Sequence, residues 1–442
     1  MRAPTDPTNE ISEPGAVRPT WKPHSRRALL LATASLAVVT PPFAAAAYWH
    51  YVNTVPPFVR SPSCTPDPDG YQQAARAVDR LQQLQPSLDR KWRTAPAPAL
   101  APLVTAAAPP LAQVRRALAW DWRKPPSLTE EGSSRANFLV AAEYLAAESR
   151  LHRLQGDPAG ALRCSVDAME LGCRTCESGK RPSGQGYQTL GMEQAQRCAD
   201  SAPLAGLAAQ LTRVRRLRLT WPRAAESLEY DRQIALADLT DRLQVSTTQT
   251  LWQQLDEAEE WLSSQSPSIL PGASLFGHGV ETWKTVLTPR AHSLALLERQ
   301  FRELKIRASS PVRDGYGPPP LTDHWARRFD PGQMGGYRWE WPRHNLALLE
   351  TALAVRLFRL EHGRYPTNLR EIEPKRLPEI PTDAWDQPIA YRIRNGRPVI
   401  YSVGRDGVDD GGKAVHPDTL IEHGMGDAVW GKLCSSDWPT KP

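Results

Sequence analysis

Residues 344–403 read HNLALLETALAVRLFRLEHGRYPTNLREIEPKRLPEIPTDAWDQPIAYRIRNGRPVIYSV. The leucines at the start of this stretch recur every three or four residues, a spacing that predicts one amphipathic helix ending at Gly363. Further on, apolar and polar residues alternate in Ile389–Arg394 and again in Pro398–Val403. The dipeptide Asn395-Gly396 between these two runs tolerates positive φ at both positions and is typical of a tight hairpin turn. The stretch therefore predicts a long helix followed by an antiparallel hairpin.

The motifs that link these elements occur in a definite order. The helix is followed by G-x-Y-P from Gly363, D-x-W-x-x-P-x-x-Y from Asp383, the hairpin, and Y-S-x-G-x-D-G from Tyr401. In this order the chain resembles the globular part of the major pseudopilin of type II secretion systems, over residues 345–430. The resemblance implies a small α+β module with an antiparallel sheet, in which Asp427–Trp430 would supply the last strand.

The chain also departs from the pseudopilin pattern. Pseudopilins carry their hydrophobic helix directly before this module, behind a processed leader, whereas the hydrophobic stretch of this chain lies near the N-terminus. The helix predicted here contains Arg356, Arg359 and Glu361, so it does not have the composition of a membrane stem. The resemblance therefore extends to the compact head, and assembly into a fibre is not expected from it.

The resemblance further implies a calcium site, because pseudopilins bind Ca²⁺ in the loop after their hairpin. The positions that match that loop are Ser402, Gly404, Asp406 and Gly407. Independently of the family, Asp406, Asp409 and Asp410 place several hard oxygens within one short turn, which suits Ca²⁺. These three aspartates are the candidate metal ligands. The alternative is an acidic, glycine-rich turn that binds no ion.

An uncharged run of twenty residues, ALLLATASLAVVTPPFAAAA, occupies positions 28–47. As a helix it is long enough to cross a bilayer core of ~30 Å. Arg26 and Arg27 precede the run, and the next Lys or Arg after it is Arg60. By the positive-inside rule we expect a single-pass helix in a bacterial cytoplasmic membrane, with the N-terminus inside and the C-terminus outside.

The same region permits a second interpretation. Ser25-Arg26-Arg27 followed by leucines is typical of a twin-arginine export signal, and Ala44–Ala47 is typical of a cleavage region with small residues. On this interpretation the mature protein is soluble, exported and begins near Tyr48. Both interpretations place the chain beyond residue 52 outside the cytoplasm.

The composition favours packed pieces joined by stiff connectors. The chain has 442 residues and 42 prolines, which cluster in junctions such as 96–110 and 267–271. We expect a multidomain fold with an N-terminal transmembrane helix, a mainly α-helical body and a small C-terminal α+β module with an antiparallel sheet. The predicted parts are 1–27 as a cytoplasmic segment, 28–48 as the transmembrane helix or signal peptide, 49–69 as a linker, 70–307 as the helical domain, 308–343 as a connector, 344–430 as the pseudopilin-like module and 431–442 as a tail.

Within the helical body, apolar spacing predicts a series of helices. They cover residues 71–84, 133–154, 159–171, 185–199, 203–219, 221–243, 250–263 and 290–307. The turn Gly156-Asp157-Pro158 and its flanks resemble one tetratricopeptide hairpin, through Leu154, Gly156, Asp157, Ala161 and Leu162. No second copy is found at a period of ~34 residues, and an ordinary helical hairpin explains the same pattern.

Six cysteines occur in the chain, namely Cys64, Cys164, Cys173, Cys176, Cys198 and Cys434. An even number in an exported protein favours disulfides. The disulfide candidates are the four that cluster in the helical body, Cys164, Cys173, Cys176 and Cys198. Two alternatives remain open for this cluster. Cys173-x-x-Cys176 has the spacing of zinc ligands, and the thiols could also be free and buried.

No catalytic motif is found along the chain. The sequence lacks H-E-x-x-H, G-x-S-x-G and a Walker-type loop, and its net charge of +6 is not gathered into basic runs with aromatics of the kind that bind nucleic acid. We therefore expect a non-catalytic, membrane-anchored envelope protein that binds or scaffolds envelope or secretion proteins, without a cofactor other than calcium. The alternative is an exported, hydrolase-like enzyme whose site assembles in the helical body.

Overall fold

The computed structural model describes the chain in separate stretches. They are residues 41–58, 69–84, 90–122, 138–177, 181–222, 224–249, 253–254, 286–308, 341–404, 406–415 and 426–432. The chain divides into two compact units, Met1–Thr54 and Val55–Pro442. In the first unit, residues 41–53 form a helix, while residues 28–40 of the predicted membrane segment lie outside the described residues.

The second unit is mainly helical and carries a small antiparallel sheet near the C-terminus, as the sequence predicts. Its helices are α2 (Gly70–Leu84), α3 (Ala97–Leu118), α4 (Leu139–Leu154), α5 (Pro158–Glu177), α6 (Arg181–Cys198), α7 (Leu204–Thr220), α8 (Ala224–Thr247), α11 (Arg290–Ala308) and α13 (Trp341–His362). Its strands are β1 (Ala390–Arg394), β2 (Arg397–Ser402) and β3 (Ala428–Val429). The helix predicted at 250–263 and the connector at 308–343 lie mostly outside the described residues.

Helix α3 corrects the prediction of a proline-rich connector at 96–110. It continues through Pro102, Pro109 and Pro110, although a proline inside a helix removes a backbone hydrogen bond. Its buried apolar side chains are spaced three or four residues apart, and they pack in one core with α2 and α4. They include Leu100, Val104, Leu111 and Val114. We attribute the helix to this burial, since tertiary packing overrides intrinsic propensity.

Among the described residues, α3 is the one helix long and apolar enough to cross a membrane. Its most apolar window has a mean hydropathy of 1.2, and 33% of that window is buried. Because its buried side packs against α2 and α4, we assign α3 to the helical body. The span predicted at 28–48 stays a prediction.

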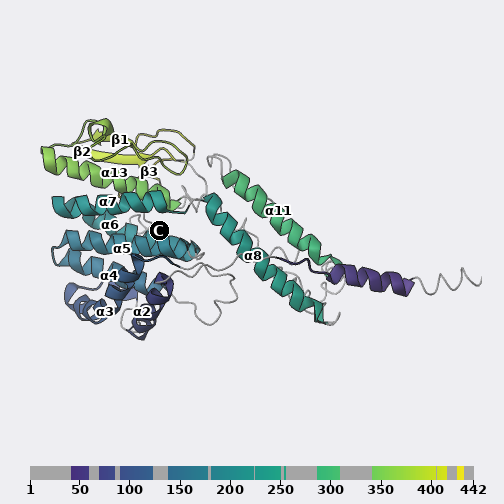
Figure 1. Cartoon of the computed structure of the whole chain (residues 1–442). Coiled ribbons are helices and arrows are strands. Elements are labelled where there is room, and N and C mark those ends of the chain that lie inside the picture. Colours follow the sequence, from purple (N-terminus) through teal and green to yellow (C-terminus); the bar gives the residue numbers. More distant parts are fainter. Residues whose placement is uncertain are drawn as a thin grey trace, which may run out of the picture. The chain divides into compact units, whose positions relative to one another are not determined.

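The helices from α2 to α7 stack side by side (Figure 1), and contacts join the neighbours α2–α3, α3–α4, α4–α5 and α5–α6. Contacts also join second neighbours, such as α4 with α6 and α5 with α7. Helical repeat proteins stack their units in this way. The hairpin around Gly156, formed by α4 and α5, therefore lies within a stack of helices, although the sequence shows no second copy of it.

Glycines set the close approach of α5 and α6. A Cβ atom added to Gly172 would lie 2.5 Å from the carbonyl oxygen of Gly184, and the reverse distance is also 2.5 Å. A Cβ atom on Gly191 would lie 2.5 Å from the carbonyl oxygen of Ser165. Any larger residue would force the two backbones apart, so these glycines fix the spacing of α5 and α6.

Helix α13 joins the stack to the sheet. It contacts α7 and α6, and it also contacts β2, so helices and sheet both cover it (Figure 1). The prediction of an amphipathic helix is therefore wrong for most of its length, because every residue from His344 to Val355 is buried. One hydrophobic core runs from α5, α6 and α7 through α13 to Ile400 in the sheet. The boundary expected at residue 344 thus does not separate two cores.

The sheet has the strand order β1-β2-β3, and both pairings are antiparallel. At the end of the β1–β2 hairpin, Asn395 and Gly396 have φ angles of 52° and 73°. The predicted turn is confirmed by these two positive angles. Strand β3 pairs with β2 through Tyr401 and Val429, which confirms the third strand expected at Asp427–Trp430.

Helices α8 and α11 form a pair with a small core of their own. Its buried side chains are Leu228, Ala235, Leu236, Leu239, Leu243, Leu297, Phe301 and Leu304. Arg232 of α8 reinforces the pair by an ion pair of 2.8 Å with Glu298 of α11. The predicted helix at 290–307 is found here, one residue longer at its C-terminal end.

Candidate functional site

The aspartates predicted to bind calcium lie in the loop after β2, and protein donors already contact two of them. Asp409 Oδ1 accepts hydrogen bonds from the Tyr401 hydroxyl at 2.9 Å and from the Gly411 amide at 2.8 Å. Its Oδ2 accepts from Arg392 Nη2 at 2.9 Å. The Gly411 hydrogen bond is the main reason that the pKa of Asp409 is lowered, so this carboxylate stays charged.

Asp406 accepts hydrogen bonds from two other backbone amides. Its Oδ2 accepts a hydrogen bond of 2.9 Å from the Gly426 amide, and its Oδ1 accepts one of 3.1 Å from the Val408 amide. Asp406 thus ties the loop to the chain just before β3. In the part of the chain that the structure describes, Asp406, Asp409 and Asp410 do not converge into one group of metal-ligating atoms.

A fourth acid, Asp427, lies in this region and is not among the ligands predicted from the sequence. It is fully buried, and its Oδ2 accepts a hydrogen bond of 2.6 Å from the Gly412 amide. Its Oδ1 forms no hydrogen bond of ordinary geometry among the described residues. Burial raises the pKa of Asp427, hydrogen bonding by the backbone amides of Gly412 and Asp410 lowers it, and the charges of Asp410 and Asp409 raise it, so that the net shift is upward. A buried carboxylate beside two others is a position that a cation would stabilise.

Asp383, which the sequence places in the loop around Trp385, has a structural role. Its Oδ1 accepts hydrogen bonds from the amides of Trp385 at 2.8 Å and Gln387 at 2.9 Å. The Ser402 hydroxyl donates to its Oδ2 at 2.5 Å. Asp383 therefore fixes the loop that covers the start of β1.

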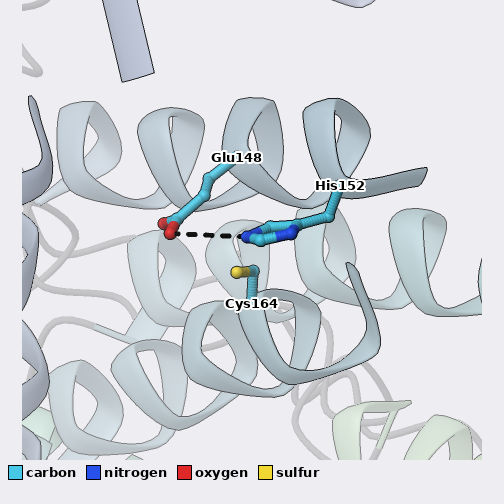
Figure 2. A group of neighbouring side chains, drawn as sticks. All are labelled: Glu148, His152 and Cys164. Atoms are coloured by element: carbon cyan, nitrogen blue, oxygen red, sulfur yellow. Dashed lines mark ion pairs between the residues drawn. The ribbon is translucent and has the colours of Figure 1, made fainter. Parts of the chain in front are cut away.

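A second cluster lies in the helical stack and combines three different donor types. Glu148 and His152 stand one turn apart on α4, and Cys164 faces them from α5 (Figure 2). Their potential ligand atoms all lie within 4.8 Å of one another, and Glu148 Oε1 is 3.9 Å from His152 Nε2. This is the one such group of His, Cys, Asp and Glu found among the residues that the structure describes.

Arg115 of α3 borders this cluster. Its Nη2 donates to Glu148 Oε2 at 2.6 Å and to Cys164 Sγ at 3.4 Å, and its Nε donates to Asp167 Oδ2 at 2.6 Å. Burial lowers the pKa of Arg115, but Asp167 and Glu148 outweigh burial and the net shift is upward. Arg115 is therefore a fixed positive charge beside Glu148 and Cys164.

The charges continue from this cluster across the stack. Arg213 of α7 contacts Asp167 at 2.7 Å and Glu170 at 2.6 Å, and Arg216 contacts Glu170 at 2.7 Å. Acidic side chains of α4 and α5 thus alternate with arginines of α3 and α7. This pairing explains how the stack accommodates the buried Asp167 and Glu170.

The second ring nitrogen of His152 is held by a carboxylate. Nδ1 lies 2.9 Å from Asp157 Oδ2, and Asp157 Oδ1 accepts a hydrogen bond of 2.9 Å from the Gly160 amide. The Gly160 hydrogen bond is the main cause that lowers the pKa of Asp157. Asp157 therefore both satisfies the first turn of α5 and orients the imidazole of His152.

The four cysteines of the helical body are buried, and no disulfide joins any two of them in the structure. The prediction of disulfides among Cys164, Cys173, Cys176 and Cys198 is therefore not met. Cys164 instead accepts from Arg115, and the Cys198 thiol donates to the Gln194 carbonyl at 3.3 Å. Cys173 and Cys176 lie on one helix, α5, and the structure does not place them in a metal-ligating group.

No family model matches the chain, and no curated protein or solved structure matches it either. We therefore infer the chemistry of the two clusters from their geometry alone. Burial strongly raises the pKa of the Cys164 thiol, with Glu148 adding to the rise, so Cys164 is a poor nucleophile. The donor set of Glu148, His152 and Cys164 suits metal binding better than acyl transfer.

Proposed function

We propose that this protein is a membrane-anchored component of the bacterial envelope, which holds a rigid helical stack outside the cytoplasm and acts by binding or scaffolding rather than by catalysis. The observation that carries the proposal is the helix at 41–53, which continues the uncharged run at 28–47. Its aromatic side chains Phe43, Tyr48 and Tyr51 are 71%, 49% and 58% exposed. Exposed aromatic rings at the end of an apolar run are typical of the membrane interface.

The continuous core of the second unit supports a scaffolding role. Helix α13 and the sheet share their hydrophobic core with α5, α6 and α7, so the pseudopilin-like part is fixed on the stack. A partner that contacts this part therefore contacts a rigid body tethered to the membrane. The resemblance to pseudopilins favours a partner among the proteins of secretion-type assemblies.

The location is tested by reporter fusions after residue 442 in a Gram-negative bacterial host. We expect an alkaline phosphatase fusion to be active and a green fluorescent protein fusion to be dark, because the chain beyond the span lies outside. N-terminal sequencing of the protein isolated from the membrane fraction should show that residues 28–47 are retained. Replacement of Arg26 and Arg27 by lysine keeps the positive charge but removes the twin-arginine pair. Export should therefore persist in this variant.

Two other outcomes would contradict parts of this proposal. A mature N-terminus near Tyr48, with export lost in the lysine variant, would support the soluble exported form and contradict the anchor. A fluorescent fusion without phosphatase activity would contradict the extracytoplasmic location itself.

We also propose that the loop of Asp406, Asp409 and Asp410 binds Ca²⁺, with Asp427 as an added ligand. The buried, partly unsatisfied carboxylate of Asp427 supports a cation at this position. The full chain is the appropriate material for the test, because α13 shares its core with α7 and a fragment from residue 340 would expose that surface.

Calcium at about 100 times its dissociation constant is expected to stabilise the chain by ~2.7 kcal/mol and to raise its melting temperature by several degrees. Asp409→Asn should abolish this rise. Asp386→Asn is the matched control, because Asp386 is exposed in the same module and its φ of 58° suits asparagine equally. Equal melting temperatures with calcium and with chelator would exclude the site.

A further inference from the structure

We infer that Glu148, His152 and Cys164 form a binding site for one transition-metal ion of the zinc class, with a fourth coordination position open to water. The inference goes beyond the proposed envelope role and does not depend on where the chain resides. A carboxylate oxygen, an imidazole nitrogen and a thiolate sulfur are the three donor types that Zn²⁺ takes from proteins.

The spacing of the three donors is close to what such an ion needs. Tetrahedral ligands around zinc lie roughly 3.3–3.8 Å from one another, given metal–ligand distances of about 2.0–2.3 Å. The separation of Glu148 Oε1 and His152 Nε2 is 3.9 Å, and all three ligand atoms lie within 4.8 Å of one another. Movement of the donors by about 1 Å or less, within the reach of small side-chain rotations, would complete the coordination.

The contact between Asp157 and His152 is an independent observation in favour of the site. Histidines that bind a metal usually donate their other ring N–H to a carboxylate, which fixes the tautomer and the direction of the free nitrogen. His152 has this partner, since its Nδ1 lies 2.9 Å from Asp157 Oδ2. The other ring nitrogen, Nε2, faces Glu148 Oε1 at 3.9 Å, and Figure 2 shows these two side chains pointing toward each other.

The packing around this contact allows no additional atom. A Cβ atom on Gly160 would lie 2.2 Å from Asp157 Oδ2 and 2.6 Å from His152 Nδ1. The first turn of α5 thus accommodates the carboxylate–imidazole pair because residue 160 is glycine. An ion could reach the site from solvent past Glu148 and His152, because their side chains are 12% and 25% exposed. Cys164, by contrast, is fully buried.

Arg115 completes the electrostatics of the site. It holds Oε2 of Glu148 and leaves Oε1 facing His152, and it also donates to Cys164 Sγ. When the ion binds, the Cys164 thiol releases its proton to solvent, and Arg115 is placed to stabilise the resulting thiolate.

The test uses the purified full chain with Cys64 and Cys434 replaced by serine, so that the two cysteines outside the described residues bind no metal. Co²⁺ is the probe, and the readout is the thiolate-to-cobalt charge-transfer absorption in the near ultraviolet. We expect one Co²⁺ per chain, displaced by Zn²⁺. Cys164→Ser should remove the band, and His152→Ala should weaken binding at least ~100-fold. Asp157→Asn removes the carboxylate that contacts His152 Nδ1, and it should weaken binding about 10–100-fold.

Cys198→Ser is the matched control, because Cys198 is also a buried thiol of the stack but lies outside the cluster. It should leave cobalt binding unchanged. A band that survives Cys164→Ser, a band lost in Cys198→Ser, or no band in the parent at saturating Co²⁺ would each overturn the site and leave an ion-paired helix interface. Asp157 is 49% exposed, so Asp157→Asn keeps the test decisive if His152→Ala does not fold.

Discussion

Glu350→Ala is expected to lower the free energy of unfolding of the chain by about 3–5 kcal/mol. Glu350 of α13 is fully buried and pairs with two arginines of α7. Its Oε1 accepts from Arg215 Nε at 2.7 Å, and its Oε2 accepts from Arg218 Nε at 2.6 Å. Alanine would leave two guanidinium groups against an apolar core, with the charge of the nearly buried Arg218 uncompensated.

The measurement is urea unfolding of the full chain, followed by tryptophan fluorescence. Glu303→Ala is the control, because Glu303 pairs with Arg299 on the exposed face of α11. An exposed pair of this kind contributes about 0–1 kcal/mol. Equal effects of the two substitutions would contradict a buried junction between α7 and α13.

The stability of the chain is expected to fall as the pH decreases below about 6.5, and His344 is expected to cause a large part of this loss. His344 is fully buried, and neither ring nitrogen has a hydrogen-bond partner among the described residues. Its ring stacks on Trp341 at 4.7 Å and meets Trp385 edge-on at 5.3 Å. Burial lowers the pKa of His344 to about 3 in the folded chain.

The sign follows from proton binding. Between pH 6.5 and pH 3 the unfolded chain binds a proton at His344 and the folded chain does not, so acid favours unfolding. The contribution is present in full above pH 6.5 and is lost by about 1.4 kcal/mol per pH unit below it, or about 2–3 kcal/mol at pH 4.5.

His344→Phe should remove this pH dependence while the ring packing is kept. The measurement is the difference in unfolding free energy between pH 7 and pH 4.5, compared for the parent and the variant. His362→Phe is a matched change at an exposed position of the same helix. A parent and a His344→Phe variant with the same pH profile would show that His344 is not buried in its neutral form.

Local chemistry explains why the C-terminal elements could be predicted. The Asn395-Gly396 turn and the two strands beside it depend on which residues tolerate positive φ and on alternation along the chain. The end of α13 at Gly363, with a φ of 72°, depends on the same property. These features are short-range, so the sequence contains all the information that they need.

The features that were missed depend on contacts between distant segments. Helix α3 forms despite Pro102, Pro109 and Pro110, because its apolar side packs with α2 and α4. Glu148 and His152 are visibly one turn apart in the sequence, but Cys164 joins them only because α5 packs on α4. Spacing along one helix cannot reveal a ligand that a neighbouring helix supplies.

The sequence by itself determined the helical character of the body, the α13–hairpin order and the uncharged N-terminal run. Periodicity, turn residues and charge are properties of neighbouring positions, so they can be identified without knowledge of the fold. Only the tertiary structure decided that α13 is buried on all sides from His344 to Val355, that the sheet shares one core with the stack, and that Asp157 holds the imidazole of His152 beside Glu148. Burial and pairing depend on which surfaces meet, and packing fixes that choice for the whole chain.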